Sequence, residues 1–311
     1  GPTSCSLANT DGPKDDQTAL AYYSAPSGNR PRYRSYIGSL RRWAAKDGKL
    51  VWTVHDEGLH LNDSEQNRIR DIRAQLRDMA DFVHVHSEAA KALIVQNFGV
   101  DAARVLVVRH PSYAPLYPDA VSGDAVADLA PRRRLLCFGH LKPYKDYQGL
   151  GNALDTLAPG SFEALTIAGQ MGGGVMLPEE TYRRNLHLDL QLGFIPDEAV
   201  PELFANAHFL VLPYTESLTS GAAALSMGFG VPVIAPDLGG MREAVPEECL
   251  PLIYNPEDPE GLTTALRVAR DMIPETYRNL AESCRAFGAA IHPDQISGSL
   301  RRFLSERGIF I

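Results

Sequence analysis

Short apolar runs alternate with amphipathic segments along most of the chain. The apolar runs predict strands, and the helical spacing of apolar residues in the amphipathic segments predicts helices. In the first half, strands are expected at Ala19–Ala25, Leu50–Asp56, Phe82–Ser87 and Val105–His110. Helices are expected between them at Tyr33–Lys46, Ser64–Met79 and Glu88–Asn97. This alternation is typical of βαβ units, which build parallel sheets.

The same alternation is stronger in the second half. Strands are expected at Leu135–Gly139, Ala164–Gly169, His187–Phe194, His208–Tyr214, Val231–Asp237 and Leu250–Tyr254. Helices are expected at Asp146–Leu157, Asp197–Ala207, Ser220–Phe229, Pro259–Met272, Glu275–Ala289 and Gln295–Glu306. The pattern therefore predicts an α/β protein with two Rossmann-like domains facing each other across a cleft.

A proline-containing stretch without periodicity, 111–134, separates the two halves and is the best candidate for an interdomain linker. The expected organisation is an irregular segment at 1–18, a first domain at 19–115, a linker at 116–133 and a second domain at 134–290. A C-terminal helix within 291–311 would pack back on the first domain. Because residues 1–18 show no opening strand, the first domain is expected to be short or truncated.

Composition, net charge and cysteine spacing restrict the kinds of molecule that the protein is expected to bind. The 311 residues include 30 Lys and Arg against 38 Asp and Glu, a net charge of −8, which disfavours a nucleic-acid-binding protein. No apolar run approaches the ~20 residues that a membrane-spanning helix needs. The four cysteines are far apart and lack metal-ligand spacing, so reduced thiols, a cytoplasmic location and no metal site are expected.

Three loops directly follow predicted strands, where ligands bind in parallel sheets. In the first, Ser220 is placed as a helix N-cap and Gly221 lets backbone approach a diphosphate, although an ordinary capped helix has the same sequence. The second carries His140, Lys142 and Lys145, whose positive charge would stabilise a leaving phosphate unless the loop is merely solvated.

The third loop lies in the first half and contains His55, Asp56 and His60. His55 or Asp56 would act as a general base or hold an acceptor hydroxyl, whereas a purely structural histidine is the alternative. His110 ends the last strand before the linker and is a weaker candidate. No G-x-x-x-x-G-K-[ST] or G-x-G-x-x-G motif is present, which disfavours P-loop and nicotinamide enzymes.

Six motifs in order resemble the nucleotide-sugar-binding domain of GT-B glycosyltransferases, in particular family 4 and its bacterial polysaccharide-type subset with a Ser-Gly motif. They are Phe138–Lys145, Leu165–Gly169, Gly193–Glu198, Leu212–Gly221, Gly230–Ile234 and Gly239–Glu243. Upstream, 50–56 and 80–87 resemble the acceptor domain of the same family. The resemblance implies a hexosyltransferase that uses a UDP- or GDP-sugar, a glycan or lipid-linked acceptor, and no metal or other cofactor.

The resemblance also implies residue roles. Lys145 would hold the donor diphosphate; His140 replaces the usual arginine, so Lys142 would supply that charge. Ser220 and Gly221 would receive the distal phosphate, the backbone at Phe194 and Ile195 would read the base, and Glu216 would contact sugar hydroxyls. His55 matches a family histidine at the cleft and would bind the acceptor, and His60 on the same loop is a further candidate for acceptor binding. The family's second glutamate would fall at Ala224 and is absent.

The family retains anomeric configuration, which is the expectation here; an inverting enzyme would make Asp56 the candidate base. The missing glutamate also motivates a non-catalytic GT-B subunit that binds nucleotide or glycan. A two-lobed sugar-binding protein of the periplasmic kind is disfavoured by the reduced cysteines and the absence of a visible signal peptide.

One segment of this acidic chain is strongly basic, which predicts a contact with a negatively charged surface. Between Arg30 and Lys49 there are seven basic residues and one acid, interleaved at helical spacing with Tyr33, Tyr36, Ile37, Leu40 and Trp43. Such a segment is typical of docking to anionic lipid, which would place the enzyme peripherally on the inner face of the cell membrane. The alternative is a helix packed in the core with a solvated basic face.

Overall fold

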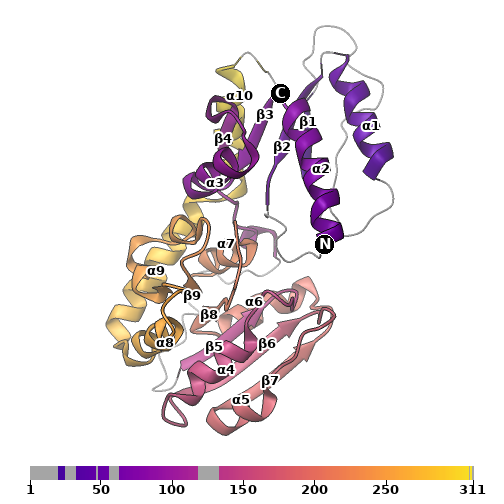
Figure 1. Ribbon diagram of the computed structural model, residues 1–311. Coiled ribbons are helices and arrows are strands. Elements are labelled where there is room, and N and C mark those ends of the chain that lie inside the picture. The colour runs from indigo at the N-terminus through magenta and orange to yellow at the C-terminus, as the bar shows by residue number, and fades with distance from the viewer. Residues whose placement is uncertain are drawn as a thin grey trace. The chain divides into compact units, whose positions relative to one another are not determined.

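The computed structural model describes residues 20–24, 33–46, 48–55, 63–117, 133–307 and 309. They form two compact units, drawn in Figure 1: one runs through Arg109 and resumes at Asp294, and the other spans His110–Pro293. The expected irregular segment at 1–18 and most of the expected linker lie outside the described residues.

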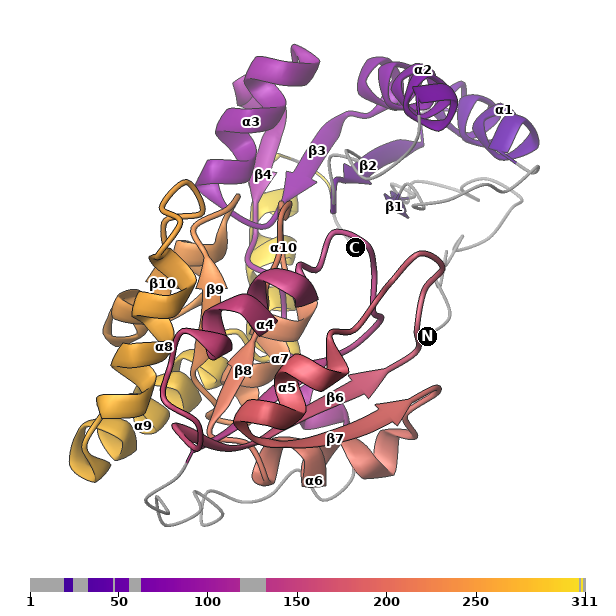
Figure 2. The same cartoon turned by 60° about the horizontal axis from the view of Figure 1, so that its bottom comes forward.

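The first unit is built on a parallel sheet whose four strands follow chain order. The strands are β1 (Leu20–Ser24), β2 (Lys49–Thr53), β3 (Phe82–Val85) and β4 (Val105–Val107). The connecting helices are α1 (Tyr33–Ala44), α2 (Asp63–Met79) and α3 (Glu88–Phe98). They lie on one side of the sheet in Figure 2, as right-handed crossovers in a single direction require.

The C-terminal helix α10 (Pro293–Ser305) belongs to this first unit. Leu304 is fully buried with Val51 of β2, and the ring of Phe303 meets that of Phe82 edge-on at 5.5 Å. Burial of such side chains stabilises by about 1.5–3 kcal/mol each, which anchors the chain's last helix to its first sheet.

The second unit contains a six-stranded parallel sheet in the order β10-β9-β8-β5-β6-β7. Its strands are β5 (Arg133–Phe138), β6 (Phe162–Gly169), β7 (His187–Leu192), β8 (Phe209–Val211), β9 (Val233–Pro236) and β10 (Ile253–Tyr254). The central strands read as continuous apolar runs because helices cover both faces of the sheet.

The helices of the second unit form two sets. In one set, α4 (Tyr147–Asp155) packs with α5 (Glu179–Asn185) and α8 (Gly261–Asp271). In the other, α7 (Gly221–Gly228) packs with α9 (Pro274–Ala290), and Phe204 of α6 (Val200–Ala205) stacks on Phe229 at 4.8 Å. Right-handed crossovers place α4 and α5 on the opposite face from α6 and α7, because the chain reverses direction across the sheet between β7 and β8.

The boundary between the units comes earlier than the expected linker at 116–133. Residues just after Arg109 already pack on the second unit: the backbone N–H of Ser112 donates to the carbonyl of Ile291 at 2.9 Å, and Ala114 is buried. A side chain at Gly228 of α7 would overlap Ser112, so this close packing requires glycine.

One predicted strand, Leu250–Tyr254, is mostly helical. A 3₁₀ segment covers Glu247–Leu252 and only Ile253–Tyr254 pairs with the sheet. Pro251 has no N–H to donate to a strand ladder, which explains the shortened strand.

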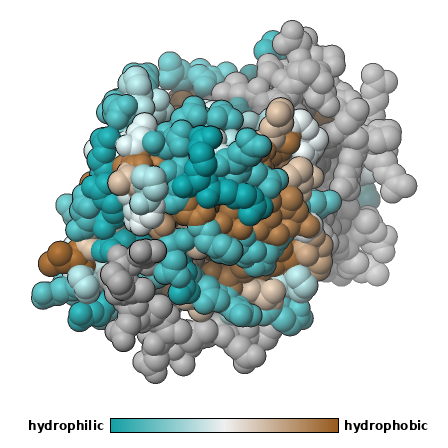
Figure 3. Space-filling view, turned by 90° about the horizontal axis from the view of Figure 1, so that it is seen from below, coloured by the Kyte–Doolittle hydropathy of each residue, from teal (hydrophilic) through white to brown (hydrophobic). Residues whose placement is uncertain are grey.

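Apolar residues gather in one region of the face seen in Figure 3, bordered by hydrophilic ones. Among the described helices, none combines the length and apolar character needed to cross a bilayer.

Cys137, Cys249 and Cys284 are buried and free, whereas Cys5 lies outside the described residues.

Candidate functional site

The carboxyl ends of β5 and β8 mark the place where the strand order of the second sheet reverses. From β5 the chain moves to β6 and β7, whereas from β8 it moves in the opposite direction to β9 and β10. The loops that leave two such neighbouring strands turn to opposite faces and separate, and ligands of open parallel sheets bind in the crevice between them. Both second-half loops singled out from the sequence begin here.

Backbone contact fixes the start of the loop after β5. The N–H of Gly139 donates to Ala168 at 3.0 Å, and the N–H of Leu141 donates to Gln170 at 2.9 Å, so this loop and the one after β6 run together beyond the strands. Gly169 has φ +146°, and a side chain there would overlap the carbonyl of Gly139. Only glycine permits this approach.

The same loop buries the ammonium group of Lys145. Its side chain is 7% exposed, its Nζ donates to the carbonyl of Phe138 at 3.3 Å, and it lies 5.7 Å from the centre of the Tyr214 ring. Burial lowers the pKa of Lys145 to about 8, and the charge of Lys142 acts in the same direction. A cation held so far from water gains strongly from a bound anion.

The loop after β8 supplies the second half of the crevice. Ser220 is the N-cap of α7: its Oγ accepts from the N–H of Ala223 at 3.2 Å, and the helix then presents its positive end. The hydroxyl of Tyr214 lies 3.4 Å from that Oγ. Tyr214 thus contacts Lys145 with its ring and Ser220 with its hydroxyl, and joins the two sequence-predicted residues into one cluster.

The two loops are also tied by their backbones. Asp146 donates its N–H to Pro213 at 2.6 Å, and Thr215 donates its N–H to Tyr144 at 2.8 Å. An isolated antiparallel bridge pairs Lys145 with Tyr214. These bonds hold the lysine and the helix cap in fixed relation, which is the preorganisation that charge stabilisation requires.

Two members of this cluster were missed or underrated from the sequence. Tyr214 reads as an ordinary strand-end aromatic, and only its contacts with Lys145 and Ser220 reveal its place. His110 was a weaker candidate, yet a side-chain carbon at Gly221 would lie 3.4 Å from its ring, beside the N-terminus of α7. Burial lowers the pKa of His110, so its ring is largely neutral near pH 7.

The remaining predicted donor residues lie on the loops around this crevice. Lys142 and His140 are exposed on the loop that carries Lys145, and partial burial together with Lys142 lowers the pKa of His140. Glu216 is half-buried on the loop between β8 and α7. Ala224, where the family's second glutamate would fall, is buried in the first half of α7.

Exposed apolar side chains gather at the end of β7 and on the loops that follow β6 and β7. Phe194 is 83% exposed, Met171 and Leu192 are also exposed, and Ile195 is half-buried against the core. The N–H of Gly193 donates to Gly169 at 3.0 Å and holds the two loops together. An exposed aromatic ring here offers a surface on which a planar base can stack.

The first unit positions His55 at the carboxyl end of β2. His55 is exposed, and its Nδ1 lies 3.3 Å from Nε2 of the buried His86 on the loop after β3. His86 was not predicted as a site residue, because no short-range pattern in the sequence links it to His55. Asp56 and His60, predicted beside His55, lie outside the described residues.

The basic segment contains α1, and the apolar side chains of this helix whose burial the structure describes are covered. Ile37, Leu40 and Trp43 are buried in the first unit, which agrees with the core-packed alternative and leaves them unable to insert into lipid. Arg41 and Arg42 remain exposed. Peripheral membrane association therefore stays a prediction that depends on charge alone.

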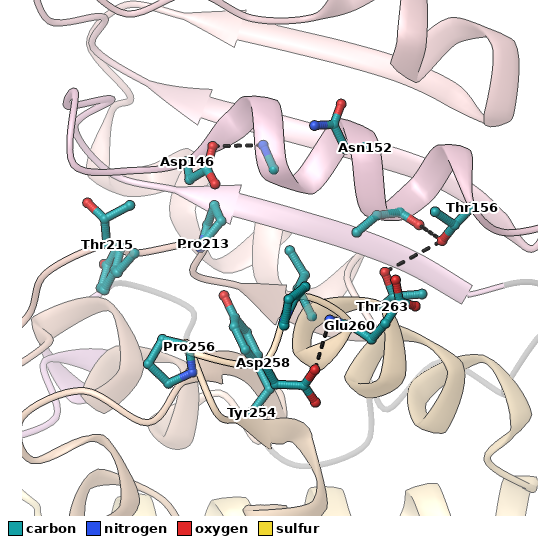
Figure 4. A pocket seen from close by; sticks show the side chains of 15 residues that line it. Asp146, Asn152, Thr156, Pro213, Thr215, Tyr254, Pro256, Asp258, Glu260 and Thr263 are labelled. Carbon is teal, nitrogen blue, oxygen red and sulfur yellow. Dashed lines mark hydrogen bonds between the residues drawn. The ribbon is translucent and has the colours of Figure 1, made fainter.

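A cavity of about 470 Å³ opens beside the crevice, between α4 and α8 (Figure 4). Tyr214 lines it, but its charged groups are the carboxylates of Asp146, Asp258 and Glu260, and no lysine, arginine or histidine is among its lining residues. Carboxylates repel a diphosphate, so this cavity is unsuited to the charged part of a nucleotide sugar.

Metal ligands are not gathered anywhere in the part of the chain that the structure describes. There, no three histidine, cysteine or acidic side chains come close enough together to hold a metal ion.

Comparison with known proteins shows what the second unit is similar to. Residues 132–270 match the family described as "Glycosyl transferases group 1". The chain is 30% identical over 258 residues to a D-inositol 3-phosphate glycosyltransferase of Corynebacterium efficiens, covering 76% of this chain and 59% of that protein. A protein of the same name from Mycolicibacterium gilvum is 25% identical over 260 residues, or 77% and 57% of the two chains. The chain thus spans under three-fifths of the length of these relatives.

Solved structures extend the likeness to both units. Sucrose-phosphate synthase from Thermosynechococcus elongatus matches with a TM-score of 0.68 and 20% identity, over 93% of this chain and 73% of that one. Anabaena HepE in complex with UDP matches with a TM-score of 0.69 and 18% identity, over 93% and 79%. At such identities the likeness shows the fold, and it confirms the parallel α/β architecture expected from the sequence. The chain therefore has the GT-B fold, matches the glycosyl transferases group 1 family over residues 132–270 and resembles the family 4 glycosyltransferases.

Proposed function

We propose that the protein is a glycosyltransferase that moves a hexose-type sugar from a UDP- or GDP-sugar to the hydroxyl of a glycan or lipid-linked acceptor. The observation that carries this proposal is the buried Lys145 ammonium, joined through Tyr214 to the capped N-terminus of α7 at the switch point of the second sheet. A fixed positive group and a helix N-terminus suit two adjacent phosphates.

The chemistry follows from where charge develops. As the glycosidic bond breaks, negative charge grows on the departing nucleoside diphosphate. Lys145 and the N–H groups at the start of α7 would stabilise that charge, with Lys142 adding a more solvated contribution. We propose that no metal is needed, because these groups supply the compensating charge.

The names of similar proteins support the donor class. Two of the HepE structures contain UDP with glucose and UDP-glucose, respectively. The relatives from Corynebacterium and Mycolicibacterium are named for transfer to inositol 3-phosphate, a hydroxylated acceptor. For this chain we propose a nucleotide sugar held by the second unit and a hydroxyl acceptor bound by the first, with His55 among its ligands.

Nucleotide binding tests the donor site directly. We expect UDP or GDP, at about 100 times its dissociation constant, to stabilise the native state by about 2.7 kcal/mol and to raise the melting temperature by about 5 °C or more. ADP and the matching nucleoside monophosphate should give smaller shifts. Differential scanning fluorimetry with the Lys145→Met variant as control identifies the site, and equal shifts in variant and wild type would contradict it.

Turnover of the donor distinguishes an enzyme from a non-catalytic binding subunit. The second reading is considered because the buried Ala224 occupies the position of the family's second glutamate. We expect transfer with retention of anomeric configuration, unchanged by EDTA. NMR of the product from an intact α-linked donor checks both points. A β-linked product would overturn retention, and nucleotide binding without donor turnover would favour the non-catalytic subunit.

A further inference from the structure

Two buried cysteines are in contact in the core of the second unit. Cys249 lies in the 3₁₀ segment Glu247–Leu252, and Cys284 lies in α9, 35 positions further along the chain. Their Sγ atoms are 3.4 Å apart, and both side chains are 0% exposed. Of the three cysteines that the structure describes, these two form the one sulfur–sulfur contact, and the proposed donor site uses neither of them.

The contact is a hydrogen bond between two thiols. A thiol is a weak donor and a weak acceptor, so one S–H donates to the sulfur of the other cysteine. This hydrogen bond raises the pKa of Cys284, and burial acts in the same direction, so Cys284 is a neutral thiol near pH 7. Sulfur atoms that already touch need only small side-chain rotations to reach the ~2.05 Å of a disulfide bond.

We propose that Cys249 and Cys284 are a modification site, at which a hydroperoxide converts the two thiols into an intramolecular disulfide. The sulfur of Cys249 attacks the peroxide, the O–O bond breaks, and Cys249 becomes a sulfenic acid while water or an alcohol leaves. The sulfur of Cys284 then attacks the sulfenic acid: the S–S bond forms, and the hydroxyl group leaves as water with the Cys284 proton. The two thiols give up two electrons in total, and these reduce the peroxide.

Cys249 takes the first step because its segment is the more easily opened of the two. A 3₁₀ segment has poorer hydrogen-bond geometry than an α-helix, and Glu247 and Glu248 of this segment are exposed. Local opening there admits a small oxidant more readily than opening of the 17-residue helix α9 does. Burial and the nearby Glu248 carboxylate disfavour a thiolate at Cys284, so the reaction takes minutes to hours.

The disulfide fastens one edge of the second unit. Between the two cysteines the chain passes through the edge strand β10 and through α8, which lie near α9 in Figure 2. Helix α9 packs closely on α7, since a side chain at Gly288 would overlap the backbone of Met227 and Gly228. The bond therefore ties this edge to the helix that Ser220 caps. A cross-link that closes such a loop stabilises the native state mainly by restricting the unfolded chain.

Peptide mapping and melting curves of reduced and oxidised protein test the proposal. A Cys5→Ser background removes the cysteine that lies outside the described residues. The native protein is treated with hydrogen peroxide at room temperature, and its unreduced peptides are mapped by mass spectrometry. We expect a Cys249–Cys284 disulfide as the main product, Cys137 still a thiol, and a melting temperature raised by about 5 °C or more. Dithiothreitol should restore the melting temperature of the reduced protein.

Two substitutions provide matched controls in the same background. Cys284→Ala leaves Cys249 without a partner, so both the disulfide and the rise in melting temperature on oxidation should be lost. Cys137→Ala removes an equally buried thiol from β5 and should keep both. Each variant is compared with its own reduced form, so a difference in starting stability does not affect the result.

The outcomes on the protein with its cysteine pair intact decide the proposal even if a variant does not fold. Thiols that stay reduced, a sulfinic acid at Cys249 in place of the disulfide, or a disulfide to Cys137 would each overturn it. A Cys249–Cys284 disulfide that leaves the melting temperature unchanged or lower would overturn the stabilising role. These measurements use neither nucleotide nor sugar, so their result is independent of the proposed function.

Discussion

Lys145→Met lowers kcat/KM for the nucleotide sugar by about 100-fold or more, the effect expected from losing one preorganised group that stabilises transition-state charge. Methionine keeps most of the apolar stem and removes only the ammonium. Because the Lys145 charge is buried, its removal relieves a desolvation cost, and the melting temperature should stay the same or rise. Activity and stability changing in opposite directions is typical of a functional residue.

Initial rates at varied donor concentration measure this effect, and Lys91→Met on α3 is the control. Lys91 is partly exposed beside Glu88, at the 4.0 Å limit of an ion pair, so its loss should change neither activity nor stability measurably. Lys145→Ala should be as inactive as Lys145→Met. Wild-type turnover in either Lys145 variant would remove the main support for the proposed donor site.

The lowered pKa of Lys145 gives a pH dependence with a definite sign. The free enzyme loses the Lys145 proton around pH 8, so kcat/KM for the donor should fall about tenfold per pH unit above that value. Stability changes the other way: between pH 8 and 10.5 the unfolded chain binds more protons than the native one, so native stability rises. Both trends should vanish in Lys145→Met, which pH-rate profiles and urea titrations at several pH values can measure.

Gly169→Ala is expected to destabilise the second unit by about 4 kcal/mol. The residue combines a positive φ of +146° with a position where a side chain would overlap the Gly139 carbonyl. Backbone strain of about 1–3 kcal/mol adds to overpacking of about 1–3 kcal/mol, because backbone atoms, rather than a flexible side chain, must move. Relief of the overlap would also displace the loop that carries Lys145.

Two neighbouring glycines provide matched controls for urea denaturation. A side-chain carbon at Gly173 would have no other atom within 4 Å, so Gly173→Ala should be neutral. Gly174 is equally open but has φ +79°, so Gly174→Ala isolates the cost of the backbone conformation. If Gly169→Ala is no less stable than Gly174→Ala, the close approach of the two loops does not constrain the site.

Short-range patterns in the sequence were sufficient to predict much of the fold. The strand at Leu135–Gly139 was predictable because burial on both faces requires a continuous apolar run. The small-residue helix beginning after Ser220 was predictable because an N-cap is indicated by the residue types next to it. The short α5 helix at Glu179–Asn185 was missed, since seven residues give too little periodicity. The strand predicted at Leu250–Tyr254 was largely wrong, because Pro251 has no N–H to donate to a strand ladder.

The amino-acid sequence by itself determined the parallel α/β class and the family resemblance, and it singled out Lys145 and Ser220 as candidates, because these inferences depend on residue types at short spacings. Only the tertiary structure decided that β5 and β8 are neighbours at the reversal of the sheet, that Tyr214 joins Lys145 to Ser220, and that His86 meets His55. These contacts link residues from separate βαβ units, or a loop folded back on itself. Strand order and loop path set such distances, and local periodicity predicts neither of them.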